Sequence, residues 1–135
     1  MSALTKDRNT PRREGGTITI GVAAGKLIYA GSLVAIDANG YATPGATSTT
    51  LKGLGRAEKQ ADNSSGANGD VTVEVAKGVF QFANDAADPV AASQIGSSCY
   101  IVDDQSVAAS DGTGTRSVAG TVFDVDPDGV WVRIS

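Results

Sequence analysis

Residues 118–134 read VAGTVFDVDPDGVWVRI, two apolar runs joined by a short polar turn. In the second run, Val130, Val132 and Ile134 alternate with two other side chains, which is the period of a half-buried β-strand. The Asp-Pro-Asp-Gly sequence between the runs suits a type I turn, because that turn favours Asp first, Pro second and Gly fourth. These residues predict an antiparallel hairpin and indicate an all-β fold.

The same signals recur upstream of this hairpin. Residues 17–22 alternate strictly, residues 37–40 have the Asp-Ala-Asn-Gly composition of a hairpin turn, and residues 71–82 predict strand structure with a bulge or corner at Gly78. Residues 58–69 are rich in turn formers and predict an exposed, mobile loop. The helix candidate spans residues 88–96, with Asp at its N-cap, Pro at its first position and Gly at its stop.

Length and composition agree with this pattern. The chain has 135 residues, 17 glycines and only 5% aromatic residues, as expected for thin strands and tight turns in a single domain. We therefore expect an all-β fold, a compact β-barrel or β-sandwich of about ten short strands with one short helix and an extended N-terminal arm. The predicted division is an arm at residues 1–16 and a single β-domain at residues 17–135.

The arm differs from the body in charge. It holds four basic and two acidic residues, a net charge of +2, whereas the whole chain carries −4. Such an extension can be a disordered tail, a hook for nucleic acid, or a strap on a neighbouring subunit. Because acidic residues interrupt the basic ones and the body is acidic, nucleic acid is not an expected partner.

Several kinds of chemistry lack their usual residues. The sequence has no histidine, the commonest general base and zinc ligand, so we expect no enzyme and no cofactor. The single cysteine, Cys99, lies in a strand-like run and is interpreted as a small buried side chain rather than a reactive thiol. There is no apolar stretch typical of a signal peptide or membrane span, which predicts a soluble chain made in the cytoplasm.

Three motifs resemble functional sites, and each has a simpler interpretation. Residues 124–129 match the start of a calcium loop, but Ser135 stands where the loop needs a bidentate Glu, so a hairpin turn is favoured and no metal site is expected. Residues 21–26 are one residue short of a phosphate loop, and residues 103–104 are interpreted as turn formers. Trp131 is a possible interface anchor, although packing in the core is equally compatible with its position.

Four stretches together resemble a known family. The chain resembles the small capsid cement, or head decoration, proteins of tailed double-stranded-DNA bacteriophages in the pattern T-x-D-R-N-T-x-R-R-E-G at residues 5–15, IYAGSLVAID at 28–37, GVFQFAN at 78–84, and the block at 95–134. The resemblance implies a β-domain that binds the outer surface of the phage head as a homotrimer and stabilises contacts between major capsid subunits. It implies a location in the virion and no small-molecule substrate or membrane.

The arm would then be a strap along capsid subunits or a neighbouring protomer. The residues assigned to it are Thr5, Asp7, Arg8, Asn9, Thr10, Arg12 and Arg13. An alternative is a β-sandwich recognition module, binding carbohydrate or dependent on calcium, on a fibre or surface. A hydrolase or accessory domain of an enzyme is a third class, and it lacks a nucleophile paired with a base.

Overall fold

A computed structural model describes residues 3–8 and 15–135 of the chain, and within these ranges it contains twelve strands. The strands are β1 (Thr17–Gly21), β2 (Leu27–Ile28), β3 (Leu33–Ile36), β4 (Ala42–Pro44), β5 (Lys52–Ala57), β6 (Ala61–Asp62), β7 (Thr72–Ala76), β8 (Gly78–Asn84), β9 (Ser98–Ile101), β10 (Ser106–Ala108), β11 (Val118–Asp126) and β12 (Gly129–Ile134). The predicted all-β class is confirmed.

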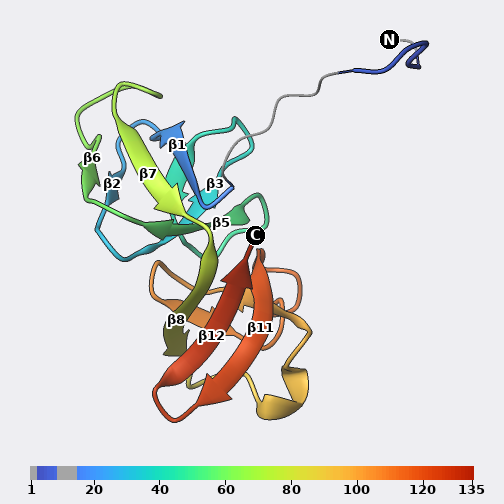
Figure 1. Cartoon of the computed structure of the whole chain (residues 1–135). Helices are drawn as coiled ribbons and strands as arrows, with labels where there is room; N and C mark the ends of the chain where they lie inside the picture. Colours follow the sequence, from blue (N-terminus) through green and yellow to red (C-terminus); the bar gives the residue numbers. More distant parts are fainter. Residues whose placement is uncertain (1–2, 9–14) are drawn as a thin grey trace.

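The strands form two units that follow one another along the chain (Figure 1). The first is a five-stranded sheet in the order β1-β7-β5-β3-β4, accompanied by the pair β2-β6. The second is a closed barrel in the order β10-β8-β12-β11-β9, so a barrel is present where the sequence left barrel and sandwich open. The edge strands of the first sheet are β1 and β4. Just after β1, the Ala23 N–H donates to the Ala42 carbonyl of β4 at 2.8 Å, which draws these two edges toward each other.

The units meet at the junction of β7 with β8 and in a shared core. Only Lys77 separates β7 from β8, so this stretch runs from the sheet into the barrel (Figure 1), and the predicted corner at Gly78 is confirmed. Leu33 and Ala35 of β3 pack in the same apolar cluster as the barrel side chains. Burial of each large aliphatic side chain contributes roughly 1.5–3 kcal/mol, so this cluster couples the two units. The boundary of a single domain at residues 17–135 stays a prediction.

The predicted hairpins form at their expected places. Residues 118–134 form β11 and β12, with Asp126 opposite Gly129, and β12 buries Val130, Val132 and Ile134 as its alternation requires. The turn at residues 37–40 joins β3 to β4, and its Gly40 has φ of 86°, a left-handed conformation that favours glycine.

The predicted helix at residues 88–96 is wrong. The structure has only a 3-10 turn at Ala92–Gln94. Asp88 does not cap it, because its carboxylate accepts hydrogen bonds from Ser110 and Arg116 instead. Asn84 bonds both the N–H and the carbonyl of Val90 and holds the chain extended at the place where a first helical turn would form.

The loop at residues 58–69 is more ordered in its contacts than its composition predicts. Ala61 and Asp62 form β6, and the next side chain, Asn63, is buried. Most of the loop is exposed, as expected, but Ala61 and Asn63 are buried. In the part of the chain that the structure describes, no helix has the length and apolar character needed to cross a membrane.

Candidate functional site

The outward face of β11 carries an unusual set of apolar side chains. Ile95, Val118 and Phe123 are exposed by 48%, 46% and 50% respectively. Ile95 follows the 3-10 turn, and the other two lie on β11. The outer wall of a barrel in water is normally polar, and neighbouring exposed apolar side chains, such as Ile95 and Phe123 beside one hollow, are typical of a contact surface.

A β-bulge interrupts β11 at Phe123. Along the β11–β12 ladder Val122 pairs with Val132, but the next pair is Asp124 with Trp131, so Phe123 is the extra residue. A bulge of this kind changes where the following side chains point. Val122 is buried in the barrel and Phe123 is exposed, as the alternation of a strand requires, and after the bulge Asp124 is exposed as well.

An arginine lies against the Phe123 ring. The guanidinium carbon of Arg133 on β12 lies 4.9 Å from the ring centroid, within the range of a cation–π contact. The contact holds both side chains in one arrangement, which lowers the entropy that they lose when a partner binds.

Two hollows flank these residues. One, of about 290 Å³, is lined by Ile95, Gly96, Thr121, Val122, Phe123 and Arg133. The other, of about 490 Å³, lies where β5 crosses β11 and β12 and is lined by Thr49, Leu51, Lys52, Gly53, residues 116–121, Arg133, Ile134 and Ser135. The two hollows share Thr121 and Arg133, and we call them together the β11 groove.

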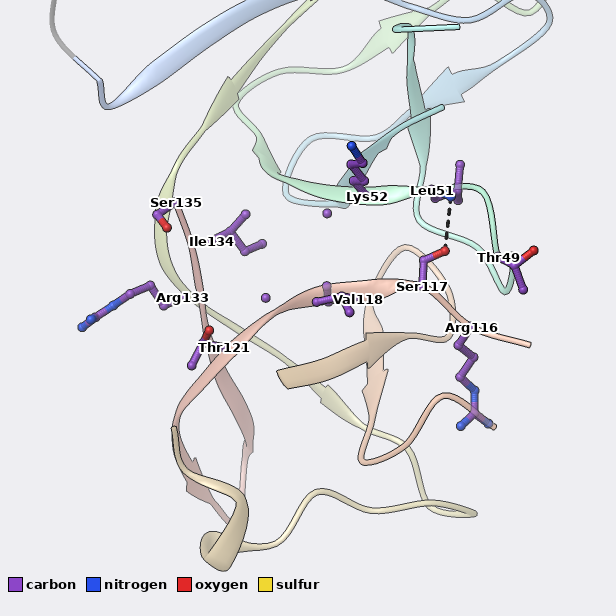
Figure 2. A pocket seen from close by; sticks show the side chains of 13 residues that line it. Thr49, Leu51, Lys52, Arg116, Ser117, Val118, Thr121, Arg133, Ile134 and Ser135 are labelled. Carbon is purple, nitrogen blue, oxygen red and sulfur yellow. Dashed lines mark hydrogen bonds between the residues drawn. The ribbon is translucent and has the colours of Figure 1, made fainter. Parts of the chain in front are cut away.

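The close approach of β5 and β11 determines the shape of this groove. A Cβ atom on Gly53 would overlap the carbonyl oxygen of Ala119, so the strands touch backbone to backbone at that point. Beside it, the Leu51 N–H donates to the Ser117 hydroxyl at 3.2 Å. Figure 2 shows Lys52 and Leu51 on one side of the hollow and Val118 on the other.

Trp131 lies on the same outer wall, next to Arg133 along β12. It is half-buried, and its indole N–H donates to the Asp126 carboxylate at 2.8 Å, which lowers the pKa of Asp126. It alternates with the buried Val130 and Val132, so its side chain lies on the outer side of β12. Its role as an interface anchor stays a prediction.

The predicted arm residues are only partly within the structure. Thr5, Asp7 and Arg8 are exposed and belong to no strand or helix. The other assigned residues, Asn9, Thr10, Arg12 and Arg13, lie outside the described residues.

The residues interpreted as structural have structural contacts. Cys99 is buried in β9, and burial raises the pKa of its thiol to about 11. Asp103 accepts the N–H of Gln105 in a turn, as expected. Within the described ranges, no group of three side chains is arranged to hold a metal ion.

The sequence reasoning missed Ile95, Val118, Phe123 and Arg133. A signal for an exposed apolar side chain was present, because the adjacent Val122 and Phe123 cannot both face the interior from one strand. No protein-family model matches the chain, and the comparisons with curated proteins and with solved structures find no match either.

Proposed function

We propose that this chain is a structural virion protein, a capsid cement or decoration protein that binds the outside of a phage head as a trimer. The observation that carries the proposal is the set of half-exposed apolar side chains on β11 and at the neighbouring Ile95, because a protein that joins subunits needs a contact surface. The family resemblance of the sequence supports the same conclusion. The proposal assigns the protein no catalytic step.

The exposed arm would be a second point of attachment. Residues 3–8 offer polar side chains and one large apolar side chain, Leu4, to a neighbouring protein. Two linked contacts retain a protein far more strongly than either alone, because the second forms at a high effective concentration. The β11 groove would provide the first contact and the arm the second.

The alternative of a calcium-dependent recognition module gains no support from the hairpin. One Asp126 carboxylate oxygen accepts the N–H groups of Asp128 and Gly129, and the other accepts the Trp131 indole N–H. These contacts are what the hairpin interpretation requires of the first turn residue. We therefore propose only the structural role.

Purified particles provide the test. We expect mass spectrometry of gradient-purified phage particles from cells producing this protein to find it in a fixed ratio to the major capsid protein. Deleting residues 1–14 should leave the circular dichroism spectrum of the body unchanged and lower the occupancy of particles. Absence of the full-length protein from particles would overturn the proposed function, and full occupancy by the truncated protein would remove the strap from it.

A further inference from the structure

The β11 groove is basic in an acidic protein. Its lining includes Lys52, Arg116 and Arg133 and no acidic side chain, although the chain has 15 acidic and 11 basic residues. Arg116 is neutralised by Asp88, whose carboxylate lies 2.9 Å away. Among the described residues, neither Lys52 nor Arg133 has a carboxylate within 4.0 Å. These two cations of the groove therefore have no carboxylate of the described residues at salt-bridge distance.

The geometry of Arg133 leaves it able to bind an anion. Its guanidinium lies over the Phe123 ring, and a stacked guanidinium keeps its in-plane N–H groups available. Those donors match the two oxygens of a carboxylate. Arg133 can thus contact Phe123 and an acidic ligand at the same time.

The shape of the groove suits an extended segment. Its floor follows β11 from Val118 to Phe123, five steps of about 3.3 Å, or about 17 Å. At one end, Ile95 and Phe123 border the hollow of about 290 Å³, which has room for an apolar side chain. At the other end lies Lys52, on the side of the groove formed by β5 (Figure 2).

We propose that the β11 groove binds an extended, acidic segment of a partner protein. The segment places an apolar side chain between Ile95 and Phe123 and carboxylates beside Arg133 and Lys52. This inference rests on the proposed function, in which the partner is a capsid subunit, and names the chemistry of the contact. The basic arm of this chain has the wrong sign of charge to be the occupant.

Titration of the ¹⁵N-labelled full chain with a defined peptide tests the charge and the place of binding. The probe is a capped hexapeptide in which glutamate alternates with leucine, and its control has lysine in place of glutamate. We expect the acidic peptide to shift the backbone amides of residues 95–96 and 118–123, with a dissociation constant of about 1 mM. The lysine peptide should bind about tenfold more weakly, and salt should weaken the acidic peptide.

Substitutions separate charge from packing. Arg133→Gln should weaken the acidic peptide about fivefold, while Arg133→Lys should retain part of the affinity because it keeps the charge. The matched control is Arg56→Gln, since Arg56 also stacks on a phenylalanine, Phe80 at 4.6 Å, but does not line the groove. That variant should bind like the unaltered protein.

Several outcomes would overturn the inference. Three results of the titration would each refute it: no shift at about 5 mM peptide, equal binding of both peptides, or shifts outside the groove. A concentration of 5 mM is about five times the expected dissociation constant. If dilution of the protein alone shifts the groove amides and lowers its sedimentation coefficient, a second copy is the occupant instead. If the double variant Lys52→Glu/Arg133→Glu occupies particles as fully as the unaltered protein does, the inference is refuted and the proposed function stands. If the unaltered protein is absent from particles, the proposed function is refuted.

Discussion

Asn63 clamps the loop after β6 to the chain that follows β1, and replacing it with aspartate should be severe. Its side-chain N–H₂ group donates to the carbonyls of Val22 at 3.0 Å, Ala23 at 3.1 Å and Ala67 at 2.9 Å. The residue is 1% exposed, so water does not replace these contacts. Asn63→Asp keeps the size of the side chain but turns the donor into an acceptor that faces three carbonyl oxygens.

The magnitude follows from those contacts. Two N–H protons lost at about 1 to 1.5 kcal/mol each, together with the cost of placing a buried carboxylate against carbonyl oxygens, give an expected loss of about 3 to 5 kcal/mol at pH 7. The surrounding carbonyls and burial disfavour a carboxylate, so the new aspartate should have a pKa above its unfolded value of about 3.9. Folding then favours the protonated form of this aspartate. The substitution is therefore least destabilising at pH values below the unfolded pKa, and the loss of stability grows as pH rises.

Urea titrations followed by circular dichroism at pH 7 and pH 3.5 measure both effects. The matched control is Asn68→Asp, because the Asn68 side-chain oxygen already accepts the Ala24 N–H at 2.8 Å and a carboxylate can do the same. We expect the control to change the unfolding free energy by at most about 0.5 kcal/mol. Equal losses in the two variants, or a larger Asn63→Asp penalty at pH 3.5 than at pH 7, would refute the donor role of Asn63.

Three further predictions concern the barrel and its crossing with the sheet. Gly53→Ala should lower the unfolding free energy measured in urea titrations by roughly 1–3 kcal/mol, because its Cβ would overlap a β11 carbonyl. The control Gly15→Ala, whose Cβ would meet nothing within 4 Å, should change it little, and equal losses in the two variants would contradict the prediction. The Trp131 indole N–H lowers the pKa of Asp126, so the contact stabilises the fold above about pH 4 and this stabilisation is lost as pH falls further. Trp131→Phe should therefore flatten the dependence of the unfolding free energy on pH between about 4 and 2. An unchanged slope would count against the contact. Cys99, with its pKa raised by burial to about 11, should not react with Ellman's reagent at pH 8 until urea is added, and fast labelling of the native protein would contradict its burial.

Local sequence predicted those elements whose contacts are also local. The β11–β12 hairpin has its turn residues and both apolar faces within 17 residues, so alternation and turn chemistry determine it. The failed helix at residues 88–96 has good local signals but distant competitors. The Asp88 carboxylate binds Ser110, 22 residues away, and Arg116, 28 residues away.

The candidate site was harder to predict for the same reason. Local sequence does not say which of the adjacent Val122 and Phe123 faces the barrel interior, and the hollow beside Phe123 depends on Ile95 from another part of the chain. Composition also misled the interpretation of Asn63, which lies among turn formers but binds carbonyls 40 and 41 residues earlier. Charge did not locate the groove either, because Lys52, Arg116 and Arg133 lie far apart in the sequence and line one hollow only in the fold.

The passage from β7 to β8 through Lys77 has a consequence for how the chain is made. Every strand of the first sheet precedes residue 77 and every strand of the barrel follows it, so a ribosome delivers the sheet complete before any barrel strand. Leu33 and Ala35 then have no barrel side chains to cover them until the later strands emerge. The nascent sheet is therefore most vulnerable to aggregation while the second half is being synthesised, and β8, which continues directly from the finished sheet, is the first strand on which the barrel can assemble.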